Sequence, residues 1–455
     1  MTHAHFTGVS PQRVRELTSI ETERYALANP SSRAMAAESA QHLMFGVPLH
    51  WMNDWGTPFP LQVAQARGAT LVDVDGHERV DFCLGDTGAM FGHSPAAVTA
   101  ALRAQAGLGL TAMLGGPDAG TVALLLTERF GMTRWQFAMT ASDANRFVLR
   151  WIRAATGRPV LLVFNGCYHG TVDDVFVDLV DGRPTQRDSL LGQVQDLTRT
   201  TRVVEFNDLS ALEAALAPGD VACVLAEPVM TNIGMVLPEP GFWERAIEII
   251  HRHGSQLVMD ETHTISSGPG GYARAHGLAA DAVVLGKPLG GGMPCAAYGF
   301  TEALAAQAEA AKRAAPPGHS GVGTTLTANL LAMAAMRATL THLMTPAVFD
   351  EMHRRCTRLA DGLRRVIARH RLPWCVTQVG ARCEFQFCAS PPRNGTEATA
   401  AMDAALEHAI HLALLNRGVV ITPFHNMMLV CPDTTDDDVE SLLIAFDGVL
   451  GQLTD

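Results

Sequence analysis

The 455-residue sequence lacks features that would place it in several other classes of protein. It has no uninterrupted run of about 18 to 20 apolar residues, the length needed to cross a bilayer. Its Lys and Arg residues are scattered rather than grouped, and the formal net charge is -12. Because phosphate binding needs a basic surface, this composition argues against a nucleic-acid partner. We therefore expect neither a membrane nor a nucleic acid among its partners.

The sequence also has no Cys-x-x-Cys pair, and we expect no secretory leader. The sequence has nine cysteines, an odd number, and none of them form a Cys-x-x-Cys pair. The first residues contain no apolar segment typical of a leader. Unpaired thiols suit a reducing compartment, so we expect a cytoplasmic protein. His408 and His411 have a spacing that metals can use, but no third ligand is evident and we expect no metal site.

The length of the chain predicts more than one domain, because single hydrophobic cores rarely grow beyond about 250 to 300 residues. Short apolar runs alternate with amphipathic stretches over residues 81–335, which is typical of a parallel sheet covered by helices. We expect this region to be the large domain. Residues 1–80 and 336–455 carry mixed strand and helix patterns and are expected to form a smaller α+β domain.

Four apolar runs in the large domain are the clearest strands, and each is followed by a polar or glycine-containing loop. They are Leu161–Phe164, Val221–Ala226, Gln256–Asp260 and Ala282–Leu285. If these strands are parallel, the loops that follow them lie on one edge of the sheet. The sequence therefore predicts one site built from these four loops.

Two of the loops carry an acid and an amine suited to an aldehyde cofactor. Lys287 follows one strand and precedes three glycines, and Asp260 ends the strand before it. An amine can form an imine with an aromatic aldehyde, and a carboxylate can pair with a ring nitrogen. Tyr168, after a third strand, could stack on such a ring. Taken alone, a Gly-Lys pair of this kind is more often a solvated lysine at the end of a strand, and the other parts of the chain change that interpretation.

A possible phosphate site lies at the start of a helix-like stretch. Thr140, Ala141 and Ser142 are small or hydroxyl residues whose amide groups could face an anion. The alternative is an ordinary helix cap in which Ser142 or Asp143 satisfies the first turn.

In their order and spacing these motifs resemble those of the class III aminotransferases. The matching segments are Thr140–Asn145, Tyr168–Gly170, Glu227–Pro228, Asp260–Glu261, Lys287 with Gly290–Gly292, and Gly323–Asn329. Within this family the chain is most similar to the branch of glutamate-1-semialdehyde aminomutase and the β-amino-acid transaminases. The resemblance implies an α/β protein of fold type I, with a mostly parallel seven-stranded sheet in the large domain, and pyridoxal 5'-phosphate as cofactor.

The resemblance also implies roles for individual residues. Lys287 would be the Schiff-base lysine and proton shuttle, Asp260 would keep the pyridine nitrogen protonated, and Tyr168 would stack on the ring. Ala141 and Ser142 would hold the phosphate. The other cofactor contacts implied are Thr140, His169, Glu227, Thr262 and, from the neighbouring subunit of a homodimer with shared active sites, Thr325. Three positions depart from the family pattern: Ala141 replaces a glycine, Asp143 a glutamate, and Thr262 a hydrophobic residue.

The substrate side is less well defined by the sequence. The arginines with which related β-amino-acid transaminases grip a carboxylate are not evident near Leu49–Met52 or Thr422–Met427. Arg382 is our candidate substitute, because a guanidinium matches a carboxylate; it could instead pair with Glu384 or another acid. His50, Trp51 and His425 are further candidates, although tryptophans are often simply buried.

These observations predict an enzyme, a pyridoxal-phosphate-dependent class III transaminase. It would move an amino group from a small amine or amino acid to an oxo acid, aldehyde or ketone by a ping-pong mechanism. One alternative is an aminomutase of the glutamate-1-semialdehyde type, which keeps the amine on one carbon skeleton. Another is a non-catalytic binding protein on the same fold.

Overall fold

The computed structural model describes residues 7–454. Contacts within the chain divide it into two compact units, which we describe separately. Of the described residues, unit 1 contains 7–95, 350–391 and 400–454. Unit 2 contains residues 96–349 and 392–399. The division into domains at residues 80 and 335 stays a prediction.

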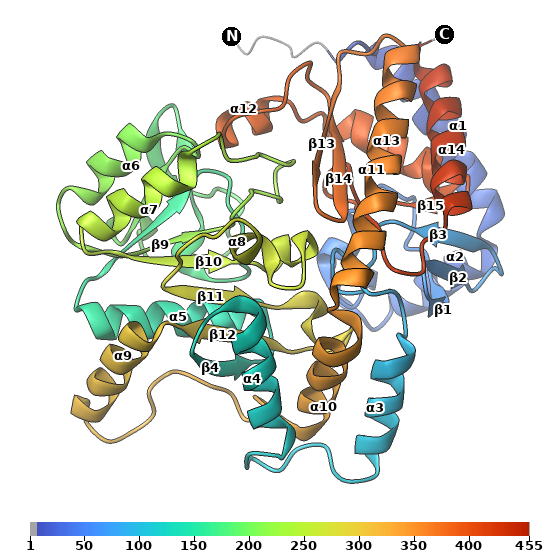
Figure 1. Cartoon of the computed structure of the whole chain (residues 1–455). Helices are drawn as coiled ribbons and strands as arrows, with labels where there is room; N and C mark the ends of the chain where they lie inside the picture. The colour runs from blue at the N-terminus through green and yellow to red at the C-terminus, as the bar shows by residue number, and fades with distance from the viewer. Residues whose placement is uncertain (1–6, 455) are drawn as a thin grey trace. The chain divides into compact units, whose positions relative to one another are not determined.

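A seven-stranded sheet forms the centre of unit 2 (Figure 1). Its strands are, in spatial order, β4 (Arg134–Ala138), β12 (Ala296–Phe300), β11 (Ala282–Leu285), β10 (Gln256–Asp260), β9 (Val221–Ala226), β5 (Val160–Phe164) and β8 (Thr201–Val204). In this order, each strand from β11 through to β8 is parallel to the next one. Strand β12 is antiparallel to both of its neighbours, β4 and β11. The four strands predicted from apolar runs are thus adjacent and parallel, and the mostly parallel seven-stranded sheet is confirmed.

Helices cover the sheet of unit 2, with α5 and α9 on one side and α6 and α7 on the other (Figure 1). The α-helices are α3 (Ala96–Ala106), α4 (Asp118–Phe130), α5 (Ala141–Thr156), α6 (Leu209–Leu216), α7 (Phe242–Arg252), α8 (Gly271–Ala275), α9 (Glu302–Ala314), α10 (Leu330–Ala338) and α12 (Gly395–Ala400). Shorter elements are η3 (Asp173–Val175), β6 (Val177–Val180), β7 (Arg183–Gln186), η4 (Leu197–Arg199), η5 (Thr264–Ser267), η6 (Lys287–Gly290) and η7 (Thr339–Leu343).

Helix α5 illustrates why these elements form. Its buried residues include Ala144, Val148 and Ile152, spaced four apart, which places them on one face. That face contacts β4, β9, β11 and β12. The helix ends at Gly157, whose φ of 68° is left-handed and suits glycine. The sequence of α5 therefore fixes both its length and the side that meets the sheet.

Unit 1 is built from both ends of the chain. Its elements are α1 (Pro11–Ala28), α2 (Pro30–Ser39), η1 (Met44–Gly46), η2 (His50–Asn53), β1 (Val63–Arg67), β2 (Thr70–Asp73), β3 (Glu78–Asp81), most of α11 (Pro346–Arg369), β13 (Cys375–Val379), β14 (Arg382–Gln386), α13 (Ala404–Leu415), β15 (Val419–Val420), β16 (Met427–Leu429) and α14 (Asp436–Thr454). Strand β15 pairs in parallel with β3 in the sheet β1-β2-β3-β15. A second sheet has the order β13-β14-β16. The smaller α+β part made by both ends of the chain is thus confirmed.

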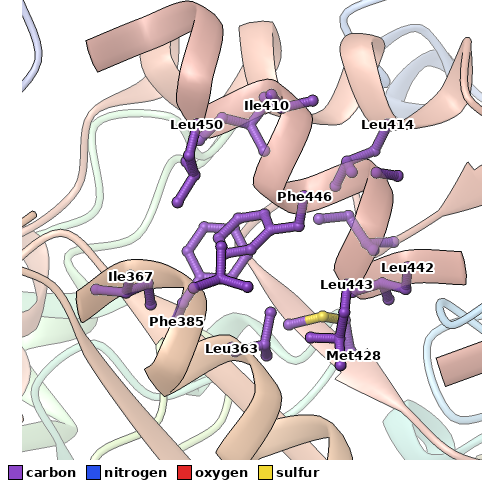
Figure 2. Close-up of a cluster of buried hydrophobic side chains, with 14 of the residues drawn as sticks. Leu363, Ile367, Phe385, Ile410, Leu414, Met428, Leu442, Leu443, Phe446 and Leu450 are labelled. Carbon is purple, nitrogen blue, oxygen red and sulfur yellow. The ribbon is translucent and has the colours of Figure 1, made fainter. Parts of the chain in front are cut away.

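The core of unit 1 lies between its helices and the sheet of β14. Figure 2 shows Phe385 of β14 among side chains of α11, α13 and α14. The ring of Phe385 lies 4.9 Å from that of Phe446, centroid to centroid. Alternate residues of β14 point to opposite faces, so Arg382 and Glu384 lie on the face away from Phe385, and both are buried. Strand β14 is therefore apolar on one side and polar but enclosed on the other.

Candidate functional site

The predicted site residues of unit 2 follow the ends of the parallel strands. Asp260 is the last residue of β10 and pairs with Val284 of β11, and Lys287 follows three residues later. His169 belongs to the loop after β5, and Glu227 directly follows β9. The structure thus brings the loops predicted from the sequence to one edge of the sheet, as the topology requires.

The start of α5 lies against this edge. A Cβ on Gly286, the residue before Lys287, would stand 2.7 Å from the Cβ of Ala141, so only glycine allows this approach. The first turn of α5 is capped by Thr140, whose hydroxyl accepts the amide of Asp143 at 3.1 Å. The alternative in which Ser142 or Asp143 caps the helix is wrong for this reason.

Ser142 joins the helix start to the loop of Tyr168. Its Oγ accepts the amide of Thr171 at 3.0 Å. Gly170, with φ of 78°, lies so close that a Cβ there would stand 2.1 Å from the Oγ of Ser142. Tyr168 is half-buried in this loop. The segment predicted to bind the phosphate and the segment predicted to stack on the ring are therefore packed against each other, while their contacts to a cofactor stay predictions.

Asp260 is held by four hydrogen bonds. Its Oδ1 accepts from the hydroxyl of Thr262 at 2.5 Å and from the amide of Thr262 at 3.1 Å. Its Oδ2 accepts from Nδ2 of Asn145 at 2.8 Å and lies 3.0 Å from Nδ1 of His169. Asp260 is 4% exposed and His169 1%. Because charge-assisted bonds of this kind are strong, the carboxylate is both fixed in position and satisfied in the protein interior.

These contacts keep Asp260 ionised. Burial raises the pKa of the Asp260 carboxyl, but the bonds from His169, Thr262 and Asn145 outweigh it, so the pKa lies below its ordinary value. Burial lowers the pKa of His169, while Cys167 and Asp260 raise it to about 10. A charged carboxylate beside a protonated imidazole is thus the expected state at neutral pH. The charged form of the Asp260 carboxylate is the form that can accept a hydrogen bond from a protonated pyridine nitrogen.

Lys287 meets a histidine that we did not include among the predicted site residues. Its Nζ lies 2.8 Å from Nε2 of His263. His263 follows Asp260 by three residues and is 8% exposed. Lys287 itself has φ of 43°, a left-handed conformation that is uncommon for residues other than glycine. Such conformations often occur at functional sites, where surrounding contacts hold them in place.

Glu227 is buried at the end of β9 and accepts two hydrogen bonds from Thr231, from its amide at 3.1 Å and its hydroxyl at 2.5 Å. Burial raises the pKa of Glu227 above its ordinary value. Among residues 7–454, buried side-chain atoms without a hydrogen-bond partner include Oε1 of Glu227, Nε2 of His169 and Oδ1 of Asn145. Protein groups alone therefore leave this polar site unsatisfied, as expected where a polar ligand binds.

The remaining predicted residue of unit 2, Thr325, lies exposed in the turn of residues 325–328. Its reach into a neighbouring subunit stays a prediction. In the part of the chain that the structure describes, no three His, Cys, Asp or Glu side chains group in a way that could hold a metal ion. Over the same residues, no helix has the length and apolar character that crossing a membrane requires.

The substrate candidates all lie in unit 1. Arg382 is fully buried and donates from Nη2 to the hydroxyl of Thr87 at 2.6 Å. Nδ1 of His425 lies 3.0 Å from Oε1 of Glu384. These two contacts give both residues a place inside unit 1, and their role toward a substrate stays a prediction.

The other two substrate candidates are at the surface of unit 1. Trp51 is 38% exposed and meets the ring of Phe424 edge to face, with centroids 5.9 Å apart. The structure thus joins the two sequence regions that we expected to face a substrate. His50 is exposed and lies near the ring of Phe45. Packing between Trp51 and Phe424 leaves much of both rings accessible.

Two residues of the site, Asn145 and His263, were not among the site residues predicted from the sequence. Asn145 was only part of a quoted motif, yet it lies one turn beyond Ala141 on α5, and that spacing could have placed it toward the sheet edge. Thr262 was predicted as a cofactor contact, and that contact stays a prediction; in the structure its hydroxyl donates to Asp260. A threonine two residues after a buried acid is a pattern that allows this local bond.

Known proteins with similar sequence and structure extend over almost all of the chain. Residues 51–450 match the aminotransferase class-III family. A glutamate-1-semialdehyde 2,1-aminomutase of Sorangium cellulosum is 34% identical over 91% of this chain and 95% of its own length. A structure of a glutamate-1-semialdehyde-aminomutase from Pseudomonas aeruginosa PAO1 in complex with PMP is 46% identical, with a TM-score of 0.96, covering 98% of this chain and 100% of that one. A β-phenylalanine aminotransferase from Variovorax paradoxus is 26% identical, with a TM-score of 0.84, and covers 96% and 97% of the two chains.

The chain belongs to the class III aminotransferase family, and it has fold type I like the class III enzymes to which it is similar. Its cofactor is pyridoxal 5'-phosphate. The site fits this group, because it offers an amine on Lys287, an ionised carboxylate on Asp260 and a helix start at Ala141 on one sheet edge. The relatives that carry the name aminomutase favour that alternative over the transaminase that we expected first.

Proposed function

We propose that the chain is a pyridoxal-phosphate-dependent aminomutase acting on glutamate 1-semialdehyde. The observation that carries the proposal is the match, at 46% identity over 98% of the chain, to a structure that has that name. The reaction would move the amino group from carbon 2 to the neighbouring carbon 1 and the oxo function in the opposite direction. Substrate and product are isomers, so no second substrate is consumed.

The residues of the site are suited to such a reaction. When bound, pyridoxal phosphate supplies an electron sink for a carbon that loses a proton. Asp260 would pair with its ring nitrogen, the start of α5 at Ala141 would bind its phosphate, and Tyr168 would cover the ring. Nζ of Lys287 would take a proton from one carbon of the substrate and return it to the next. One base can serve both carbons because they are adjacent in the same molecule.

The test supplies the purified holoenzyme with glutamate 1-semialdehyde alone, without an external amine or oxo acid. The expected product is 5-amino-4-oxopentanoate, followed by mass spectrometry. Lys287→Ala should abolish product formation. Lys312→Ala is the matched control, because Lys312 is the only other lysine in the sequence and lies exposed on α9. Turnover that requires an external amine acceptor would instead establish an aminotransferase.

We also propose a homodimer in which Thr325 reaches the phosphate of the neighbouring subunit. Its support is the exposed position of Thr325 and the family to which the chain belongs. Light scattering of the eluted protein should give about twice the mass of 48.7 kDa. Thr325→Ala should weaken pyridoxal phosphate binding while the mass stays that of a dimer.

A further inference from the structure

Lys287 lies beside an imidazole for which the proposed function has so far given no role. Nε2 of His263 lies 2.8 Å from Nζ of Lys287, a hydrogen-bond distance. Both side chains lie at the sheet edge that carries Asp260. The contact therefore involves the amine on which the proposed function depends.

The loop of His263 is tied to the strand that leads to Lys287. The amide of Glu261 donates to the carbonyl of Val284 in β11 at 2.9 Å. The hydroxyl of Ser266 donates to the carbonyl of His263 at 3.0 Å. The two ends of the His263–Lys287 contact are thus held in register by the pairing of β10 with β11.

Buried bonds within the loop fix it further. The carboxylate of Glu261 accepts the hydroxyl of Thr264 at 2.5 Å and the amides of Tyr272 and Ala273 at 2.9 and 2.6 Å. A Cβ on Gly271 would stand 2.8 Å from this carboxylate. His263 therefore occupies a preorganised position rather than the tip of a loose loop.

We propose that His263 is a positioning residue for Lys287, which holds the Nζ amine in place and exchanges a proton with it. A charged amine can only donate, so Nε2 accepts its proton. When the amine is neutral, a protonated Nε2 can donate to it instead, and the hydrogen bond persists with the proton on either atom. Imidazole suits this exchange because its ordinary pKa lies near neutrality. The inference deepens the proposed function and rests on the role of Lys287 in it.

Four further ionisable groups at these strand ends have hydrogen-bond partners of their own. Asp260 and His169 bond to each other, Glu227 accepts from Thr231, and Glu261 accepts from Thr264. His263 lies within hydrogen-bond distance of the amine of Lys287. A change at position 263 should therefore be felt first at that amine.

The test is made on the apoprotein, so that it does not depend on the reaction catalysed. Each protein is treated with an acylating reagent specific for amines over a range of pH, and labelling of Lys287 is followed by peptide mass mapping. Lys312 gives the internal control. His263→Gln places an amide oxygen near the position of Nε2, whereas the shorter His263→Asn does not reach it.

Loss of an acceptor for the charged amine favours the neutral, reactive form. We expect the labelling midpoint of Lys287 to move about one to two pH units lower in His263→Asn, since a hydrogen bond to a charged group contributes about 1.5 to 3 kcal/mol. In His263→Gln it should stay near that of the unchanged protein, and Lys312 should not respond in either variant. An unchanged midpoint in His263→Asn would overturn the positioning role, whichever reaction the enzyme catalyses.

The proton exchange has a separate readout in the holoenzyme. Glutamine can hold the amine but cannot take up and release a proton near neutral pH. After addition of an amino substrate, the rate at which the cofactor absorbance changes should therefore be at least about tenfold lower in His263→Gln than in the unchanged protein. An equal rate in His263→Gln and the unchanged protein would overturn the exchange and leave the positioning role.

Discussion

The hydroxyl of Thr262 offers a direct test of the contacts that hold Asp260. Thr262→Val keeps the shape of the side chain and removes one of four donors, while the amide of Thr262, Asn145 and His169 remain. A hydrogen bond to a charged group contributes about 1.5 to 3 kcal/mol. We expect local opening of residues 256–267 to become about 10-fold to about 100-fold more frequent. Hydrogen exchange of peptides from this segment measures it directly.

Thr264→Val is the matched control. Both threonines are buried and donate a 2.5 Å bond to a buried acid, Thr262 to Asp260 and Thr264 to Glu261. Both variants should speed exchange. Only Thr262→Val should raise the pKa of Asp260, because the lost donor favoured the charged form of this carboxyl. The change in absorbance that bound pyridoxal phosphate shows on acidification should therefore occur about one to two pH units higher. Exchange in Thr262→Val within twofold of the unchanged protein would refute the reasoning.

Three further predictions concern other contacts. Gly170→Ala should lower the melting temperature and the yield of folded protein, because φ is 78° and the new Cβ would meet the Oγ of Ser142; a melting curve like that of the unchanged protein would contradict this. His169 has a pKa raised from 6.5 to about 10, so its contribution to stability should be complete below pH 6.5 and lost as the pH rises through 10. As the pH rises over this range, the melting temperature should fall less steeply in His169→Gln than in the unchanged protein. Equal slopes of melting temperature against pH would count against a raised pKa of His169. Thr87→Val should lower the free energy of unfolding by about 1.5 to 3 kcal/mol, since it removes a hydrogen-bond partner of the buried Arg382. Chemical unfolding measures this quantity, and an unchanged free energy of unfolding would show that the 2.6 Å bond contributes nothing.

Much of the fold could be predicted because its signals are local. Runs such as Val221–Ala226 are apolar throughout, as expected of strands buried on both faces, and parallel order follows from the alternation with helices. Lys287 and Asp260 could be found for the same reason, since Asp260 ends such a run and Lys287 follows one. Their neighbourhood on one sheet edge is a consequence of topology.

Contacts made by side chains across loops could not be predicted in this way. The bond between Lys287 and His263 depends on the course of a hydrogen-bonded turn, and no periodicity in the sequence encodes it. The buried position of Arg382 was also not evident, because its strand alternates Arg, Cys, Glu and Phe and resembles one with a solvated face. Only the packed structure shows that both faces of this strand are enclosed.

The pairing of β3 with β15 has a consequence for biosynthesis. Val80 leaves the ribosome long before Val419, its neighbour in the sheet, and the whole of unit 2 is synthesised between them. The amino-terminal strands must therefore wait with an unpaired edge, which is prone to misassociation, until the last part of the chain emerges. Maturation should thus begin in the middle of the polypeptide and finish when its two ends meet.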